Sequence, residues 1–99
     1  MSVDERDVES YLRRKVERLG FLYLKFIPDY KNGMPDRQVL LPDGRVVWVE
    51  LKTKGGRPSQ LQLLRKEELS RAGHRVAYVW SKEQADTFCA ELAEEYGKN

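Results

Sequence analysis

The sequence predicts an α/β fold in which a mixed sheet is flanked by helices, with the elements in the order αβββαβα. Two observations support this prediction. Apolar residues recur at helical spacing in three segments, and four short segments rich in aromatic and β-branched residues lie between turns that contain Gly, Pro or Asp. A chain of 99 residues can enclose one core. We therefore expect residues 1–99 to form a single domain.

Three amphipathic segments are predicted to be helices: residues 4–19, 59–72 and 82–96. Each begins at or just after a residue that suits an N-cap: Asp4, Ser59 and Ser81. Gly20 and Gly73 follow the first two helices and favour their ends. The expected apolar side of the second helix comprises Leu61, Leu64, Leu69 and Ala72. The expected apolar side of the third comprises Ala85, Phe88, Cys89, Leu92 and Tyr96.

Four apolar segments are predicted to be strands: residues 21–27, 36–41, 45–52 and 75–80. The third contains the uninterrupted run Val46-Val47-Trp48-Val49, which is typical of a strand covered on both faces. This run ends in Glu50-Leu51-Lys52, so a carboxylate and an ammonium group lie at the end of a buried strand. Charged groups are costly in such a place unless they are paired or bind an ion, and this motif therefore indicates a functional site.

The loop Pro42-Asp43-Gly44 predicts the register between the second and third strands. Its residues suit a three-residue hairpin loop, in which a type I turn is followed by a left-handed glycine. In that register Asp36 lies opposite Glu50, and opposed residues share one face. Lys52 shares the same face, because alternate residues of a strand point the same way. A two-residue turn at Asp43-Gly44 would instead send Asp36 and Glu50 to opposite faces.

Two carboxylates in one buried corner repel each other unless a cation lies between them. Mg²⁺ and Mn²⁺ prefer carboxylate, carbonyl and water oxygens, and an ammonium group beside such an ion can stabilise a phosphate oxygen or a hydroxide. Asp36, Glu50 and Lys52 therefore suit metal-assisted hydrolysis of a phosphodiester. The structural alternatives are that Asp36 is only a turn residue and that Glu50 and Lys52 form a solvated pair. Trp48, on the same face, argues against full exposure.

Composition limits the other classes of function. The formal net charge of +2 is too small to indicate a polyanionic partner by itself, but residues 45–75 are strongly basic. The single cysteine, Cys89, allows neither a disulfide within the chain nor a Cys-based metal site. The N-terminal residues form no apolar signal segment, and no apolar run has membrane-spanning length. We expect an intracellular protein with no membrane partner.

The arrangement of these motifs resembles a known nuclease family. Pro35-Asp36 followed by Glu50-Leu51-Lys52 is the PD-(D/E)xK nuclease signature, and Gly33-Met34 precedes it. Gly55-Gly56 then leads to Ser59-Gln60-Leu61-Gln62. With Glu9 in the first helix, this pattern closely resembles the VRR-NUC family in the short, stand-alone form found in phages and bacteria. The resemblance covers nearly the whole chain and implies a PD-(D/E)xK, restriction-endonuclease-like core.

The resemblance also implies a role for each motif residue. Asp36 and Glu50 would bind Mg²⁺ or Mn²⁺ with help from the backbone carbonyl of Leu51. Glu9 would reach the metal directly or through water. Lys52 would activate or orient the attacking water and stabilise the charged transition state. The set Asp36, Glu50, Lys52 and Gln62 is thus the expected catalytic machinery.

Gln62 is the motif glutamine by its Ser-x-x-Gln spacing, and the resemblance implies that it orients Lys52 or the water; Gln60 is close enough to be an alternative. Cationic residues near the site are candidates for contacts with DNA phosphates. They are Lys54, Arg57, Arg37 and Lys31. For Lys54 and Arg57, which flank Gly55-Gly56, the alternative is a flexible solvated loop.

The expected function is metal-dependent, structure-selective cleavage of DNA by an endonuclease. The sequence has no helix-turn-helix, so we expect recognition of DNA shape rather than base sequence. Stand-alone members of the family resemble Holliday-junction resolvases. The resemblance therefore implies a homodimer acting on branched DNA, in DNA repair, in the cytoplasm of a bacterial or phage-infected cell. Candidate interface residues are Tyr11, Phe21 and Tyr23. The alternatives are a flap or single-strand DNA nuclease and a catalytically silent nucleic-acid-binding module.

Overall fold

The computed structural model describes the backbone of residues 3–97 and the side chains of residues 5–96. Its elements are α1 (Val3–Arg18), β1 (Leu22–Lys25), β2 (Arg37–Leu40), β3 (Val46–Leu51), α2 (Gln60–Arg71), β4 (Arg75–Val79) and α3 (Lys82–Gly97). This order confirms the prediction αβββαβα. One cap was wrongly predicted: α1 begins at Val3, so Asp4 lies inside the helix. Ser59 does cap α2, where its hydroxyl accepts a hydrogen bond from the Gln62 amide.

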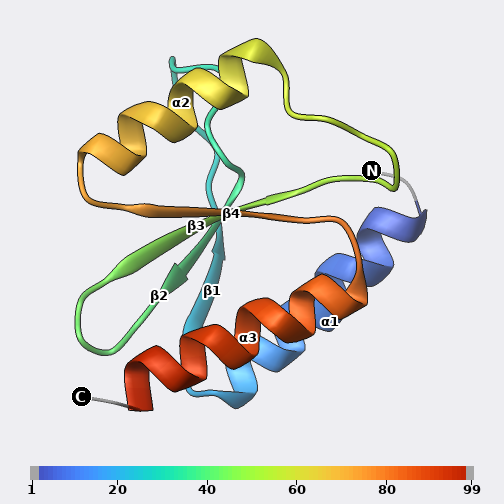
Figure 1. Cartoon of the computed structure of the whole chain (residues 1–99), viewed down its shortest axis with the longest axis vertical. Helices are drawn as coiled ribbons and strands as arrows, with labels where there is room; N and C mark the ends of the chain where they lie inside the picture. The colour runs from blue at the N-terminus through green and yellow to red at the C-terminus, as the bar shows by residue number, and fades with distance from the viewer. Residues whose placement is uncertain (1–2, 98–99) are drawn as a thin grey trace.

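The four strands form one mixed sheet in the order β1-β2-β3-β4. The pairs β1–β2 and β2–β3 are antiparallel, whereas β3 and β4 are parallel. Parallel neighbours need a crossover connection, and α2 supplies it. The crossover places α2 on one face of the sheet, while α1 and α3 lie side by side on the other face (Figure 1). No helix in the described part of the chain is long and apolar enough to cross a membrane.

The main core lies between the sheet and the pair α1–α3. Every second residue of the central strands points into it, because strand side chains alternate between faces. These strand residues are Val39, Val47, Val49 and Leu51. They meet Leu12 and Val16 of α1 and the expected apolar side of α3, including Cys89, which is buried and free. The α3 pattern in the sequence was therefore predicted correctly.

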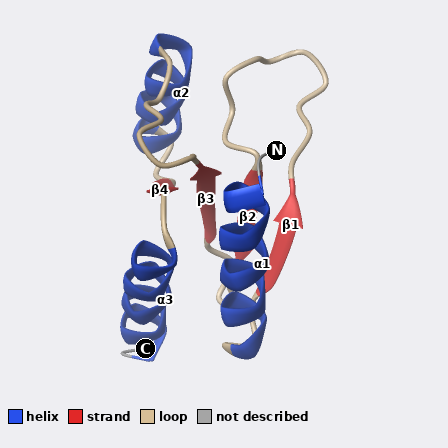
Figure 2. Ribbon diagram, turned by 90° about the vertical axis from the view of Figure 1, so that its right-hand side faces the viewer, coloured by secondary structure: helices blue, strands red, loops and turns tan. Residues whose placement is uncertain are grey.

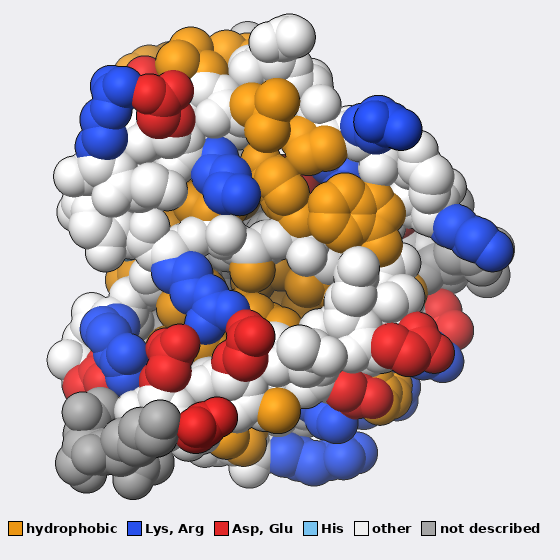
Figure 3. Space-filling view, viewed as in Figure 1, with side chains coloured by type: hydrophobic (Ala, Val, Ile, Leu, Met, Phe, Trp, Pro, Cys, Tyr) orange, Lys and Arg blue, Asp and Glu red, His pale blue; other side chains and the backbone are white. Residues whose placement is uncertain are grey.

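The predicted apolar side of α2 is not buried. None of the residues of α2 is buried, and Leu61, Leu63 and Leu64 remain about two-fifths exposed. The helix packs mainly on the edge strand β4 and leaves the sheet face above β1 and β2 uncovered. Figure 3 shows apolar side chains gathered in the upper half of the molecule, where α2 lies in Figure 1.

The long connection between β1 and β2 extends beyond the strand ends, at the end of the molecule where α2 lies (Figure 2). It contacts α2, because Arg65 Nε donates a hydrogen bond of 2.8 Å to the carbonyl oxygen of Asn32. Gly33 allows this close approach: its φ is +85°, and a Cβ there would lie 2.6 Å from Leu61 Cγ. Close packing against α2 therefore explains why a glycine precedes the Pro35-Asp36 motif.

The register of the β2–β3 hairpin agrees with the three-residue loop. Gln38 pairs with Trp48, and Val39 pairs with Val47. The amide of Leu41 donates to the carbonyl of Arg45 at 3.0 Å, and Gly44 has a φ of +94°. Continued by one residue beyond Arg37, which pairs with Val49, this register brings Asp36 opposite Glu50.

Candidate active site

Two carboxylates meet at one end of the sheet, where β2 begins and β3 ends. The Glu50 side chain lies on the α2 face, and the residue is only 7 % exposed. Asp36 is more open, but its Oδ1 atom is buried and has no hydrogen-bond partner among the described residues. A buried acceptor without a donor is costly, so this oxygen is available for a cation or a bound ligand.

The electrostatics of the pair reflect burial and mutual repulsion. Burial, and after it the negative charge of Asp36, raise the pKa of Glu50 to about 7, against the opposing effects of Lys52 and Arg37. Burial also raises the pKa of Asp36, against the opposing effect of Arg37. Both carboxyl groups are therefore destabilised as anions, which is the condition under which a cation binds favourably.

The donor set fits a divalent cation such as Mg²⁺ or Mn²⁺. The free Oδ1 of Asp36 and the buried carboxylate of Glu50 are hard oxygen ligands. The backbone carbonyl of Leu51, the next residue in the chain after Glu50, is a third candidate ligand. Within the described residues, no group of three or more His, Cys, Asp or Glu side chains comes together. A cation here would complete its shell with water and phosphate oxygens, as Mg²⁺ commonly does in phosphoryl-transfer sites.

Glu9 and Arg37 pair with each other, contrary to expectation. The guanidinium of Arg37 binds the Glu9 carboxylate through Nε and Nη2. Its Nη1 donates to the Asp36 carbonyl at 3.0 Å and lies 3.3 Å from Asp36 Oδ2. Arg37 is 3 % exposed, so the prediction that it contacts DNA is corrected: burial under Glu9 and Asp36 removes it from the surface. Glu9 is likewise held by Arg37 rather than directed at the two carboxylates.

Lys52 is held by a residue of α2. Its ammonium donates to Gln62 Oε1 at 2.6 Å, and the Ser59 amide donates to the same oxygen at 2.9 Å. The Gln62 amide in turn donates to the Ser59 hydroxyl, which completes a capping box at the start of α2. The motif Ser-x-x-Gln therefore couples helix initiation to the orientation of Lys52, and this contact singles out Gln62 over Gln60.

The remaining DNA-binding candidates lie at the surface. Lys54 and Arg57 are exposed in the loop after β3, and neither has an ion-pair partner among the described residues. Lys31 is exposed, but its Nζ atom lies 3.8 Å from Glu68 Oε1. Lys54 and Arg57 are therefore the cations most available to a phosphate beside the site.

Sequence reasoning missed one residue that faces Glu50. Tyr78 of β4 pairs with Glu50 in the parallel register, and its hydroxyl is buried without a partner among the described residues. The ammonium of Lys66 from α2 lies 5.1 Å from the centre of its ring. Burial raises the pKa of Tyr78, and the charge of Glu50 adds to this shift. No local signal could reveal this neighbour, because the register of β4 depends on a crossover rather than on a turn.

The burial of Glu50 should make the free energy of unfolding of the protein depend on pH. Its folded pKa of about 7 exceeds its ordinary value of 4.5, so the folded metal-free protein loses stability as the pH rises from about 4.5 to about 7, where the unfolded chain ionises and the buried group does not. This penalty disappears as the pH falls from about 8 to about 5 and should be of the order of 2 kcal/mol. Urea unfolding of the wild type and Glu50→Gln at pH 8 and 5.5, in a chelator, measures it. Equal pH dependence in both proteins would contradict this account.

The fold and this site define the class: an α/β domain of the PD-(D/E)xK type, with two carboxylates and a lysine at one end of a mixed sheet. The chain belongs to the VRR-NUC family. A solved structure described as a VRR_NUC domain superimposes with a TM-score of 0.80 and 32 % identity, covering 87 % of this chain and 94 % of that one.

A second comparison agrees with this assignment. The chain is 33 % identical over 81 residues to a protein named "Putative nuclease p44", from Acyrthosiphon pisum secondary endosymbiont phage 1. The match covers 82 % of this chain and 87 % of the phage protein. No family model matches the sequence.

Proposed function

We propose that this protein is a divalent-metal-dependent DNA endonuclease that selects its substrate by structure. The observation that carries the proposal is the convergence of Asp36, Glu50 and Lys52 at one strand end, with Lys52 oriented by Gln62. The name of the phage relative supports the nuclease class. The residues 1–99 would act as one domain.

Each residue of the site has a chemical task in this proposal. Asp36 and Glu50, with the Leu51 carbonyl, would hold Mg²⁺ or Mn²⁺, which when bound polarises a phosphate oxygen and a water. The Lys52 ammonium stabilises the negative charge that develops on the phosphate and holds the water in line for attack. Gln62 limits the motion of Lys52 through the 2.6 Å hydrogen bond. Arg37, tied to Glu9, holds one side of Asp36 and leaves Oδ1 free.

The surroundings of the site favour recognition of DNA structure. Loops surround the strand ends that carry the site, and the exposed cations Lys54 and Arg57 suit phosphates, which carry no base information. Branched DNA, with a four-way junction as the first candidate, offers a distinctive backbone path without requiring base contacts.

A cleavage panel tests the proposal. We expect cleavage of four-way junctions in the presence of Mg²⁺ or Mn²⁺, little cleavage of linear duplex, and none in a chelator. Preferential cleavage of flaps or single strands would show that these DNAs, and not the four-way junction, are the substrate. If the protein binds DNA but cleaves none with any of the metals, the proposed nuclease activity is wrong and a catalytically silent binding module is favoured. Glu67→Ala, which alters an exposed carboxylate on α2, is a suitable active control.

We propose further that the active form is a two-fold homodimer, because two symmetric strands need two matching sites. Of the three interface residues predicted from the sequence, Phe21 is corrected, because it is buried against Tyr96. Tyr11 and Tyr23 are partly exposed, although the Tyr11 hydroxyl donates to Asp86 at 2.6 Å and both residues pack against the core. The exposed apolar surface lies instead on the edge strand β1 and the loop after it. Its most exposed members are Leu22 at 61 %, Ile27 at 78 % and Tyr30 at 90 %.

This interface predicts which substitution breaks the dimer. We expect sedimentation equilibrium at micromolar concentration to give a dimer for the wild type and a monomer for Leu22→Arg combined with Ile27→Arg. Leu64→Arg, which changes an equally apolar exposed residue on α2, should leave the dimer intact. Dissociation by Leu64→Arg alone would move the interface to α2. A monomeric wild type would remove the junction substrate and favour a flap or single-strand nuclease.

A further inference from the structure

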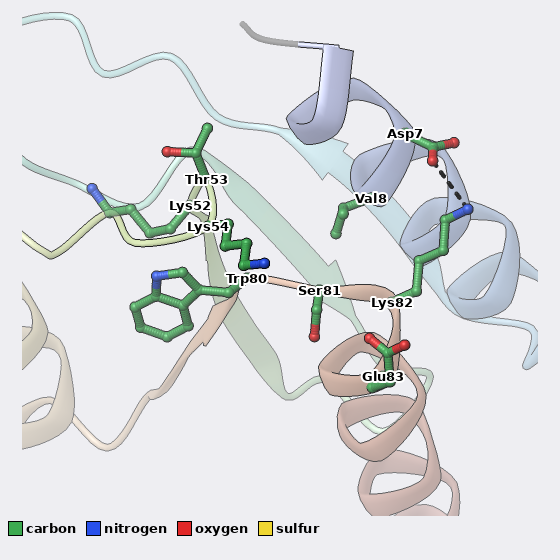
Figure 4. A pocket seen from close by; sticks show the side chains of 9 residues that line it. All are labelled: Asp7, Val8, Lys52, Thr53, Lys54, Trp80, Ser81, Lys82 and Glu83. Carbon is green, nitrogen blue, oxygen red and sulfur yellow. Dashed lines mark ion pairs between the residues drawn. The ribbon is translucent and has the colours of Figure 1, made fainter.

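A hollow of about 320 Å³ lies beside the candidate active site. It is bounded by the N-terminal part of α1, the segment that follows β3, and the junction between β4 and α3. Figure 4 shows Val8 of α1 and Lys54 pointing toward the space between these segments. Lys52 also lines the hollow, but its ammonium points to the opposite side of the strand end, toward Gln62 (Figure 4). The hollow and the active site therefore share Lys52 and lie on opposite sides of this strand end.

The walls of the hollow are mostly apolar and are held in place. Val8 forms one wall and packs against the core. Trp80 borders the hollow, but its indole is turned away from Val8 (Figure 4), and Nε1 donates to the Gly56 carbonyl at 2.6 Å. This bond ties Trp80 to the loop that carries Lys54. An apolar wall next to charged side chains suits a ring with an apolar face and polar edges.

The rim of the hollow is charged. Lys54 has no partner among the described residues, whereas Lys82 lies 3.0 Å from Asp7 Oδ2 and joins the start of α3 to α1. Glu83 adds a second carboxylate. Ammonium groups suit phosphates, and carboxylates accept hydrogen bonds from amino groups. This combination of apolar walls and mixed charges is complementary to a nucleotide rather than to a phosphate alone.

We propose that the hollow accommodates one unpaired nucleotide of the DNA strand that is cut. The enzyme would then select DNA that has an unpaired nucleotide near the scissile bond. The inference rests on the proposed nuclease function and names the substrate feature that this site reads. Lys52 and Lys54 are two residues apart, so their Cα atoms lie within about 8 Å. A base in the hollow would therefore belong to a nucleotide close to the scissile phosphate. A nucleotide inside a duplex cannot enter it without leaving the stack, and an unpaired one enters at the lowest cost.

An abasic scan tests the proposal on the wild-type protein. Cleavage is mapped first on a branched DNA with one unpaired nucleotide at the branch. Affinity is then measured by fluorescence anisotropy in a chelator, where no cut occurs, while each nucleotide near the cut is replaced in turn by an abasic residue. We expect a single position at which loss of the base weakens binding about tenfold, since stacking of one base contributes about that much. A flat scan would overturn the proposal.

Variants identify the hollow as the place where this base binds. Val8→Phe fills the hollow and should lower the affinity for intact DNA about as much as the abasic replacement lowers that of the wild type. The affinity of Val8→Phe for abasic DNA should be no lower than its affinity for intact DNA. Lys54→Ala should weaken both DNAs equally and reduce the salt dependence by about one unit of slope. Arg18→Ala, at the far end of α1, is the matched control and should change neither.

Two outcomes separate this inference from the nuclease itself. An abasic effect that persists in full in folded Val8→Phe would place the base elsewhere and overturn the proposal while leaving the nuclease intact. Absence of cleavage on every DNA would overturn the nuclease function, and the binding scan would still decide whether the hollow holds a base. Circular dichroism checks the fold of each variant, and the smaller substitution Val8→Leu takes its place in the same comparison if Val8→Phe does not fold.

Discussion

Replacing either Asp36 or Glu50 by alanine is expected to abolish DNA cleavage while the domain remains folded. The two carboxylates face each other where β2 begins and β3 ends. Without one of them, the remaining carboxylate cannot hold a divalent ion in place, and we expect a loss of about 10³-fold or more, as when a main electrostatic group of an active site is removed.

The fold of these variants should be checked by calorimetry in a chelator. Removal of one carboxylate relieves the repulsion that raises the pKa of Glu50, so the metal-free variants should unfold no more easily than the wild type at pH 8. Mn²⁺ should raise the unfolding temperature of the wild type and not that of either variant. Full activity in Asp36→Ala or Glu50→Ala would remove this site from the mechanism.

The second large effect concerns Lys52. Its ammonium is held by Gln62 beside the carboxylates, where charge develops in the transition state, so Lys52→Ala should lower kcat by about 10²–10³-fold. The affinity for DNA should change little, because the interaction is made mainly in the transition state. Single-turnover cleavage and anisotropy binding on the same junction separate the two quantities.

Lys54→Ala and Arg57→Ala are the comparison for Lys52→Ala. Both residues are exposed cations in the loop after β3, and their expected contribution is to phosphate binding. These variants should weaken binding and reduce its salt dependence, while kcat at saturating DNA stays close to that of the wild type. Similar losses of affinity in all three variants would show that Lys52 is only another phosphate contact.

Much of this architecture could be predicted from the sequence because its signals are local. The residues Pro42-Asp43-Gly44 specify a turn, the turn specifies the β2–β3 register, and the register opposes Asp36 to Glu50. Apolar spacing over a few turns was enough to predict the buried face of α3. The capping box at the start of α2 is also local, since Ser59 and Gln62 are three residues apart.

The features of the site that were missed depend on contacts between distant segments. Arg37 looked like a surface cation, but α1 brings Glu9 over it, and 28 residues separate the two partners in the chain. Tyr78 faces Glu50 only because β4 is parallel to β3, and a crossover helix leaves that register open.

The exposure of α2 was likewise decided by packing. Its leucines have helical spacing, yet the helix rests on the edge strand β4 and has no second layer over its apolar side. Periodicity shows which residues share a side of a helix, not whether anything covers that side. The sequence alone therefore determined the elements, the favoured hairpin register and the candidate catalytic motif. Tertiary structure decided which charges are buried, which partners they have and which apolar surfaces remain open, because these depend on how separate segments meet in space.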